Sequence, residues 1–257
     1  MAIHPTAIIA AGAQLHPSVE VGPYAIVGPK VKAAAGTWIG PHAVVEGDTT
    51  LGERNKIFQF ASVGAPPQDL KYAGEDSKLV IGDDNQIREF ATLHIGTRGG
   101  GNVTRVGNKN LFMAYSHVAH DCQVGNGCVF ANSATLAGHV EVGNHVILGG
   151  LSAIHQFTRI GDYAMIAGGA IVVMDVPPFC IAQGDRAELA GLNTVGLTRH
   201  GFSDEQVARI KDAYRILFRS KLGLNEAISR LKAEHQGQKE IDLLLDFVTS
   251  SKRGFTR

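Results

Sequence analysis

Two histidines and an aspartate, close together in the chain, are the side chains best suited to chemistry. His117, His120 and Asp121 open the stretch HVAHDCQVGNGCVFANSATLAG, which ends at Gly138. A histidine beside a carboxylate can act as a general base, because the imidazole takes up a proton while the carboxylate orients the ring. The spacing therefore predicts a site that deprotonates a hydroxyl group.

The same stretch belongs to a six-residue repeat of large apolar side chains. The repeat runs from Ile3 to Val63, resumes at Ile81, shifts by seven residues and continues from Val106 to Val172. A period of six matches neither a helix nor a strand, but it matches a short strand followed by a corner, where glycine would accommodate unusual backbone angles. Three units would close one triangular coil, and stacked coils would pair their strands in parallel. The pattern predicts a β-solenoid.

Two segments interrupt this repeat. The segment GAPPQDLKYAGEDSK, at about residues 64–80, has charged residues at the apolar positions and is expected to leave the column as a loop. The seven-residue shift near Arg98 to Asn102 contains three glycines and predicts a smaller loop. Long loops on a rigid scaffold commonly carry function, so we expect the first one to contact a ligand.

A different pattern follows the repeat, which stops at the VPP sequence of residues 176–178. Helical spacing begins after Ser203, and two more helices are expected from Asn225 to about His235 and from Glu240 to about Ser250. We therefore predict an all-β solenoid in residues 1–185 and a C-terminal α-helical domain in residues 186–257.

The register of the repeat places five of the eleven histidines on one edge of the column. They are His94, His117, His120, His139 and His155. Gly138 has the corner position of His120, one coil further on, so its backbone N–H is expected about 5 Å away and could stabilise an oxyanion. Clustered titratable side chains on one edge predict a functional site, although a polar, solvated edge would show the same pattern.

Composition limits the class of protein. The 24 basic and 24 acidic side chains balance, which argues against a nucleic-acid binder. The three cysteines have no metal-binding spacing, and Cys122 and Cys128 fall on inward repeat positions, so buried thiols in a reducing compartment are expected. No signal peptide and no apolar run of membrane-spanning length are visible. These features predict a cytoplasmic protein without stable membrane insertion.

Two other functions fit the histidine cluster. A zinc site of three histidines occurs in hexapeptide-repeat carbonic anhydrases, although their ligands have a wider spacing and come from two subunits. The column could also serve without catalysis, as a trimeric scaffold or a carrier-binding module.

Longer motifs favour an acyltransferase. The stretches AHDCQVGN, LAGHVEVGN, IHQF, QDLKYAGE, DVPPFCIAQG and RHGFS resemble the UDP-N-acetylglucosamine O-acyltransferase family of lipid A biosynthesis. The resemblance covers essentially the whole chain. It implies a left-handed parallel β-helix, a homotrimer, and transfer of an R-3-hydroxyacyl chain from acyl carrier protein to the glucosamine 3-hydroxyl of UDP-N-acetylglucosamine, with no metal or redox cofactor.

The resemblance also implies roles for individual residues. His120 would be the general base, Asp121 its orienting partner and Gly138 the oxyanion amide. The implied substrate-binding residues are Gln68, Asp69 and Lys71 in the loop, His94, His117, His139, His155 and Gln156 in the groove, and Asn193 and Arg199 in the tail. Gly168 would leave room for a long acyl chain of the hydroxymyristoyl class, although a glycine chosen only for a turn would look the same.

The tail departs from the family pattern at two positions. Val195 replaces a usual glutamate and His200 a usual second arginine, which leaves nucleotide contacts from these two positions in doubt. Lys211, Arg215 and Arg219 form a stripe at helical spacing. Such a stripe could be a solvated face, or it could dock an acidic carrier protein.

Overall fold

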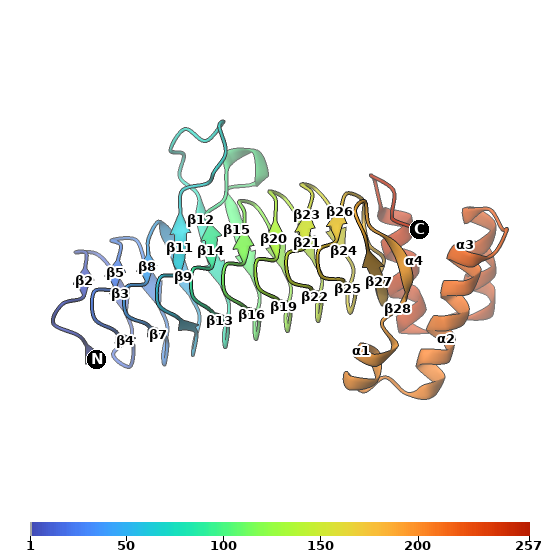
Figure 1. The fold of residues 1–257 in the computed structure, drawn as a ribbon, viewed down its shortest axis with the longest axis horizontal. Coiled ribbons are helices and arrows are strands. Elements are labelled where there is room, and N and C mark those ends of the chain that lie inside the picture. Colours follow the sequence, from blue (N-terminus) through green and yellow to red (C-terminus); the bar gives the residue numbers. More distant parts are fainter. Residues whose placement is uncertain (1) are drawn as a thin grey trace.

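The computed structural model describes residues 2–257 as a three-sided column of short strands followed by a group of helices (Figure 1). Strands recur at the same point of successive coils, so Val118 pairs with Leu136, and Leu136 pairs with Ile154. All pairs within the column are parallel, and each of its three faces is a separate sheet. The predicted β-solenoid is confirmed.

The strands group by face. Sheet 1 contains, in spatial order, β1 (Ala2–Ile3), β4 (Glu20–Val21), β7 (Trp38–Ile39), β10 (Lys56–Ile57), β13 (Gln86–Ile87), β16 (Leu111–Phe112), β19 (Val129–Phe130), β22 (Ile147–Leu148), β25 (Met165–Ile166), β27 (Cys180–Gln183) and β28 (Glu188–Leu192). Sheet 2 contains β2 (Ile8–Ile9), β5 (Ile26–Val27), β8 (Val44–Val45), β11 (Ser62–Ala65), β14 (Thr92–His94), β17 (His117–Val118), β20 (Thr135–Leu136), β23 (Ala153–Ile154) and β26 (Ile171–Val172). Sheet 3 contains β3 (Gln14–Leu15), β6 (Lys32–Ala33), β9 (Asp48–Leu51), β12 (Lys78–Ile81), β15 (Val103–Val106), β18 (Gln123–Val124), β21 (Glu141–Val142) and β24 (Arg159–Ile160).

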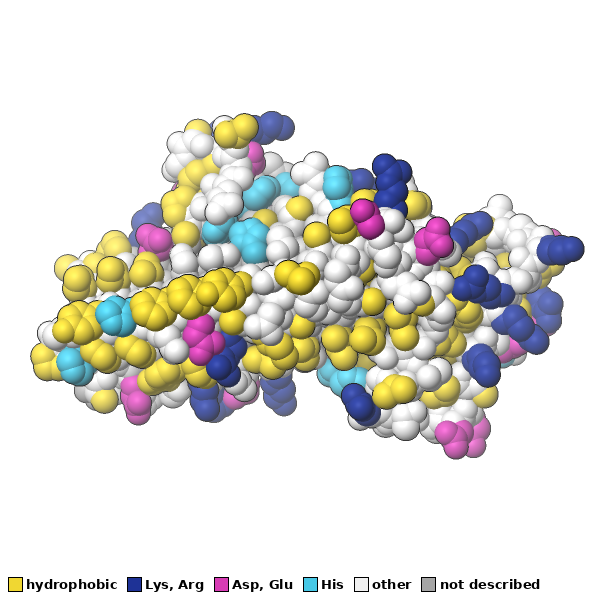
Figure 2. Space-filling view, viewed as in Figure 1, with side chains coloured by type: hydrophobic (Ala, Val, Ile, Leu, Met, Phe, Trp, Pro, Cys, Tyr) yellow, Lys and Arg dark blue, Asp and Glu magenta, His cyan; other side chains and the backbone are white. Residues whose placement is uncertain are grey.

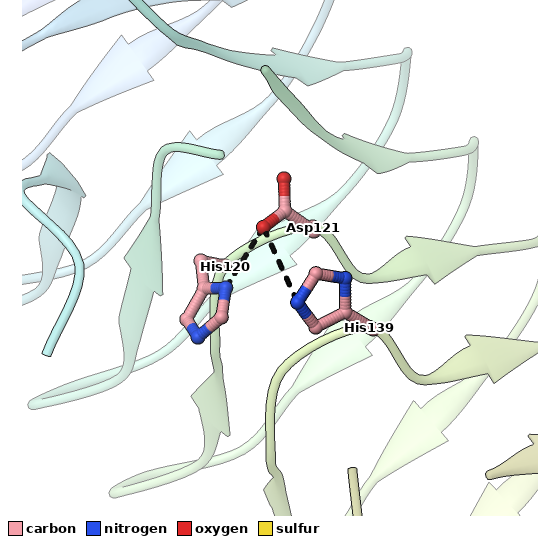
Figure 3. A group of neighbouring side chains, drawn as sticks. All are labelled: His120, Asp121 and His139. Atoms are coloured by element: carbon pink, nitrogen blue, oxygen red, sulfur yellow. Dashed lines mark hydrogen bonds and ion pairs between the residues drawn. The ribbon is translucent and has the colours of Figure 1, made fainter. Parts of the chain in front are cut away.

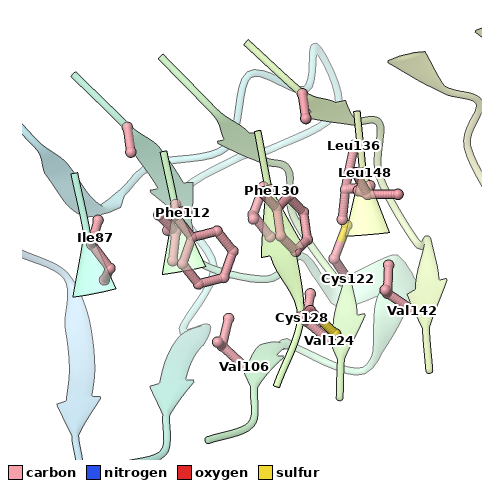
Figure 4. Close-up of a cluster of buried hydrophobic side chains, with 14 of the residues drawn as sticks. Ile87, Val106, Phe112, Cys122, Val124, Cys128, Phe130, Leu136, Val142 and Leu148 are labelled. Atoms are coloured by element: carbon pink, nitrogen blue, oxygen red, sulfur yellow. The ribbon is translucent and has the colours of Figure 1, made fainter. Parts of the chain in front are cut away.

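The inside of the column is a continuous apolar core. The second residue of each two-residue strand points inward, and these side chains are buried from Val21 to Val172. Phe112 and Phe130 lie with their ring centroids 4.6 Å apart (Figure 4). Removing either ring would cost about 3–5 kcal/mol of stability by the usual size of such cavities. The three cysteines are free and buried, as expected for Cys122 and Cys128.

Most corners contain a residue in the left-handed backbone region, three positions after the inward-pointing residue. Asp121, with φ 60°, and His139, with φ 61°, hold this position. The expectation that glycine supplies the unusual angle is wrong for the glycines directly after the strands, such as Gly40, whose φ is not positive. A Cβ on Gly40 would lie 2.8 Å from the Ile57 carbonyl oxygen, so close stacking of corners is the reason for glycine there.

Two loops leave the column where the repeat fails. The loop between β11 and β12 protrudes from the column in Figure 1. The second loop follows β14 and contains the 3-10 turn η1 (Arg98–Gly100). Leu93 pairs with Val118, 25 residues later instead of 18, which accounts for the seven inserted residues.

The C-terminal helices are α1 (Thr194–Arg199), α2 (Asp204–Tyr214), α3 (Leu224–Glu234) and α4 (Lys239–Ser250), with the π-helical turn η2 (Arg215–Arg219) after α2. Ser203 caps α2 in a capping box with Gln206, at the predicted N-terminus. The sequence did not predict α1, nor the antiparallel pairing of β27 with β28. This hairpin spans the expected boundary at residue 185, so sheet 1 continues to Leu192 before the helices begin.

A row of aromatic rings follows the edge between sheets 1 and 2. Tyr24, His42, Phe60, Phe90 and Tyr115 stack in this order, with centroids 4.9–5.2 Å apart. Figure 2 shows the row on the surface of the N-terminal half. The four carbocyclic rings are 43–60% exposed, which makes a continuous apolar strip on the single chain.

Candidate active site

His120 and Asp121 form a hydrogen-bonded pair at the corner between β17 and β18. The imidazole Nδ1 lies 2.8 Å from the Asp121 Oδ2. The carboxylate side chain is 1% exposed and the imidazole 14%. A buried carboxylate at Nδ1 favours the tautomer in which Nδ1 carries the proton and Nε2 is free to accept one.

His139 approaches the same carboxylate from the next coil (Figure 3). Its Nε2 lies 3.8 Å from the Asp121 Oδ2, and its ring is perpendicular to that of His120 at 5.1 Å. The other face of His139 stacks on Phe157 at 4.4 Å. Burial lowers the pKa of His139, against an opposing effect of Asp121, so this ring favours its neutral form.

Gly138 forms the wall next to the reactive nitrogen. A Cβ built on Gly138 would lie 2.6 Å from the His120 Nε2. Gly138 is buried, and its backbone N–H has no hydrogen-bond acceptor within residues 2–257. Proline occupies the same corner position at residues 5, 17, 23, 29 and 41, which is possible because the coil leaves this N–H unused. At Gly138 the unpaired donor lies beside a catalytic candidate.

Two further histidines, His94 and His117, lie on the adjacent strands β14 and β17 of sheet 2. His117 accepts or donates a 2.7 Å hydrogen bond with the Thr92 hydroxyl. His94 packs edge-to-face on His117 at 4.9 Å. Burial, followed by repulsion from His117 and His120, lowers the pKa of His94 to about 4, so it is neutral at physiological pH. The His94 Nδ1 is buried with no partner among the described residues, and it is therefore free for a ligand.

The protruding loop closes over these side chains. A cavity of about 560 Å³ lies between the loop and the β14–β17–β20 stack. Its lining includes Gln68, Asp69, Lys71, His94, His117, His120, Gly138 and Gln156, together with Leu70, Ala119, Thr135, Leu136 and Ala137. A larger groove of about 740 Å³ runs along sheet 3 towards α4, but no histidine lines it. The histidine-lined cavity is thus the candidate active site.

Six predicted site residues do not line this cavity: Asp121 and His139, which contact His120, and His155, Gly168, Asn193 and Arg199. His155 is exposed, and its Nδ1 lies 3.1 Å from the Gln156 carbonyl oxygen. Gly168 lies on the corner between sheets 1 and 2, the edge of the aromatic row, whereas His120 lies between sheets 2 and 3. The φ of Gly168 is not positive, and a Cβ built on Gly168 would meet nothing nearer than 3.4 Å, so no turn requires glycine there.

The two predicted tail residues, Asn193 and Arg199, lie at the two ends of α1. The Asn193 side chain caps α1 by accepting from the Gly196 N–H and also donates to the Tyr163 carbonyl oxygen. Arg199 is exposed in the last turn of α1. Neither residue lines the cavity within one chain.

The predicted cationic stripe is altered by local structure. The Arg219 guanidinium donates to the Leu189 carbonyl oxygen and to the Tyr214 hydroxyl, both at 2.9 Å. Arg215 pairs with Asp212 at 2.6 Å but stays 71% exposed. Arg219 is therefore held against the β-hairpin, and Lys211 and Arg215 remain as surface cations.

The catalytic candidates His120 and Asp121, together with His139, also carry side chains of the kind that bind metals. Atoms of His120, Asp121 and His139 lie within 4.8 Å of one another. Two ligands on a tetrahedral zinc would be about 3.3 Å apart, given bonds of about 2.0–2.2 Å. The 2.8 Å between Nδ1 and Oδ2 is instead a hydrogen-bond distance, and the carboxylate already accepts two bonds from Thr97. The arrangement fits a hydrogen-bonded pair better than a zinc site.

The sequence predicted a small loop near Arg98 to Asn102, but it did not indicate that Thr97 contacts the Asp121 carboxylate. The Thr97 backbone N–H donates to the Asp121 Oδ1, and its hydroxyl donates to Oδ2. The seven-residue shift of the repeat and its three glycines marked the loop in the sequence, and neither pointed to Asp121.

Comparison with known proteins identifies the class and then the family. Residues 104–138 match the bacterial transferase hexapeptide repeat, so the column and its cavity belong to a hexapeptide-repeat transferase. Residues 175–256 match the second domain of UDP N-acetylglucosamine O-acyltransferase. The chain is 66% identical, over 99% of both sequences, to the acyl-(acyl-carrier-protein)–UDP-N-acetylglucosamine O-acyltransferase of Myxococcus xanthus. The protein therefore belongs to this family of O-acyltransferases.

Solved structures of similar proteins have the same fold as this chain. The UDP-N-acetylglucosamine O-acyltransferase of Moraxella catarrhalis is 45% identical and superposes with a TM-score of 0.97 over 100% of both chains. LpxA from Acinetobacter baumannii, also 45% identical, gives 0.96 over 99% of each chain. The expected left-handed β-helix with C-terminal helices is thereby confirmed. Within the described residues, no helix combines the length and apolar character needed to span a bilayer.

Proposed function

We propose that the protein transfers an R-3-hydroxyacyl chain from acyl carrier protein to the glucosamine 3-hydroxyl of UDP-N-acetylglucosamine, the first step of lipid A biosynthesis. The names of its relatives support both substrates. The observation that carries the mechanism is the His120 imidazole, which is held by a buried carboxylate at Nδ1 and lies against Gly138 at Nε2.

The chemistry follows from this geometry. The His120 Nε2 removes the proton of the sugar hydroxyl as the oxygen attacks the thioester carbonyl carbon. The Gly138 N–H stabilises the negative charge that develops on the carbonyl oxygen. When the carbon–sulfur bond breaks, the His120 imidazolium gives its proton to the leaving thiolate. Asp121 stays ionised, orients the ring and stabilises the imidazolium.

Substrate contacts divide between the loop, the column and a neighbouring subunit. Gln68, Asp69 and Lys71 cover the cavity and are proposed to contact the nucleotide sugar, and the neutral His94 and His117 would donate or accept hydrogen bonds to its hydroxyls. His139, His155 and Gln156 extend this polar edge towards the helices. In a homotrimer, Asn193, Arg199 and Gly168 of an adjacent chain would complete the groove, the first two at the uridine diphosphate and Gly168 at the acyl chain.

The homotrimer has a physical basis in the aromatic row. Tyr24, Phe60, Phe90 and Tyr115 expose a strip that extends in register towards Leu151, which is 74% exposed, and Gly169. A second copy of this chain would desolvate the strip and cover the open side of the active-site edge. Light scattering should give the mass of three chains, and Phe60→Asp with Phe90→Asp should lower the mass and the activity together. A monomeric wild type with full activity would contradict the trimer.

One substitution tests the catalytic assignment. In a transfer assay with hydroxyacyl donors and UDP-N-acetylglucosamine, His120→Ala should lower activity by about 100-fold or more, the usual size of a general-base effect. His16→Ala is the matched control, because this exposed histidine lies at the first coil, far from the cavity. Near-normal activity of His120→Ala would contradict the mechanism. Stoichiometric zinc with loss of activity on chelation would support a carbonic anhydrase-like zinc enzyme instead. A wild type that binds both substrates without transfer would support the non-catalytic scaffold.

A further inference from the structure

The inserted loop after β14 holds the catalytic carboxylate from both sides. Thr97, which is 4% exposed, donates its backbone N–H to the Asp121 Oδ1 at 2.8 Å and its hydroxyl to Oδ2 at 2.5 Å. The Oδ2 atom is the one that also meets the His120 Nδ1. Two donors in fixed positions leave the carboxylate a single orientation.

The backbone of the loop is shaped around this contact. A Cβ on Gly100 would overlap the Asp121 carboxyl group, so only glycine lets the loop pack here. The Thr97 carbonyl oxygen accepts from the N–H groups of Gly100 and Asn102, which closes the loop into a tight turn. On the other side, the Asp121 backbone N–H donates to the Thr104 hydroxyl at 2.7 Å. Asp121 is thus held at both its backbone and its side chain.

The loop is also tied to the substrate loop. Glu75, at the end of the protruding loop, accepts from the Arg98 N–H at 3.0 Å and from the Ala73 N–H at 2.9 Å. These backbone hydrogen bonds lower the pKa of Glu75, which keeps it an anionic acceptor. The residue next to Thr97 is therefore anchored by the loop that covers the cavity.

We propose that Thr97 is a positioning residue of this active site, which acts through Asp121 to hold the His120 imidazole in the productive orientation and tautomer. The inference rests on the proposed transferase mechanism. It also gives the seven inserted residues of this coil a role, because an ordinary six-residue unit would leave the buried carboxylate without its two donors.

The test is the substitution Thr97→Val, which keeps the side-chain shape and the backbone donor but removes the hydroxyl. It should lower kcat by about 10- to 100-fold, the usual effect of a group that orients a catalytic residue, with KM for both substrates within about twofold. Thr97→Ser restores the hydroxyl and should recover most of kcat. The matched control is Thr50→Val on β9, because Val80 already occupies the paired outward position on β12.

A double-mutant cycle separates positioning from stability. If Thr97 acts through Asp121, Thr97→Val should add no further loss to Asp121→Ala. An equal loss in both backgrounds, or an unchanged kcat in Thr97→Val, would overturn the proposal. If the valine variant does not fold, Thr97→Cys, of similar size and with a weak donor, takes its place in the cycle.

A readout independent of turnover separates this inference from the proposed function. NMR spectra of protein with isotope-labelled histidine nitrogens should show His120 with its proton on Nδ1 in the wild type. In Thr97→Val they should show a mixture of tautomers. An inactive wild type with this spectral change would contradict the transferase and leave the positioning role intact. An active wild type whose His120 spectrum is the same in Thr97→Val would overturn the positioning role alone.

Discussion

Gly138 and His120 occupy the same corner position on adjacent coils, and the glycine lies against the Cε1–Nε2 edge of the imidazole. A Cβ at residue 138 would be 2.5 Å from the His120 Cε1 and 2.6 Å from Nε2. Real Cβ atoms do not approach ring atoms this closely. The space that a side chain would fill is the space that the reacting atoms need.

Gly138→Ala should therefore displace the His120 ring. A displacement of about 1 Å in a catalytic group costs about 100-fold in rate, so kcat should fall by this order while the melting temperature changes little. Gly223→Ala is the control, because a Cβ there meets nothing within 4 Å. Steady-state kinetics of both variants checks the prediction, and a Gly138→Ala enzyme with wild-type kcat would remove Gly138 from the site.

Gly168→Met tests the length of the acyl chain. The wild type should prefer donors of the hydroxymyristoyl class, and methionine should block the far end of the groove, with loss of long donors and retention of short ones. Each methylene that loses its buried position costs about 0.8 kcal/mol. Gly169→Met is the comparison, since Gly169 has φ 70° and a side chain there should lower stability and affect all donors equally. A chain-length profile that does not move, or a wild type that favours ten-carbon donors, would end this assignment.

The buried His94 predicts a loss of stability in acid. Its pKa is lowered from 6.5 to about 4 in the folded protein, mainly by burial, so the unfolded chain takes up the proton first. Stability from this group is complete above pH 6.5 and is lost as the pH falls towards 4, by at most about 3 kcal/mol. Urea unfolding at pH 7 and pH 4.5 should show a smaller difference for His94→Gln than for the wild type. His4→Gln, at an exposed position, should behave as the wild type, and parallel curves for all three proteins would contradict the prediction.

The surface cations of α2 and η2 predict where the carrier protein docks. Lys211→Glu combined with Arg215→Glu should raise KM for acyl carrier protein several-fold and flatten its dependence on salt, with KM for the nucleotide sugar unchanged. Arg219 is left intact, because its hydrogen bonds to Leu189 and Tyr214 hold the hairpin to the helices. Arg230→Glu with Lys232→Glu makes the same charge change on α3. Equal effects of the two pairs would show that only net charge matters.

Much of the fold can be predicted from the sequence, because the repeat that specifies it depends only on residues close together in the chain. A strand of two residues and a corner of four repeat with a fixed period, so each inward position can be assigned from its neighbours alone. Even the insertion of seven residues is visible as a shift in that period, and it reappears as the 25-residue spacing of Leu93 and Val118. The same register places His94, His117, His120 and Gly138 on successive coils of one edge.

Contacts between loops have no such period. Nothing in the sequence relates Thr97 to Asp121, because they meet only when the insertion folds back over the next coil. Likewise, the sequence did not predict that the Asn193 side chain caps α1. Arg219 matched a surface stripe, whereas the hairpin that turns its guanidinium inward forms by an antiparallel pairing that the repeat does not contain. Periodic packing can be inferred from residue spacing, but the partners of an individual polar group depend on where non-repeating segments return to the column.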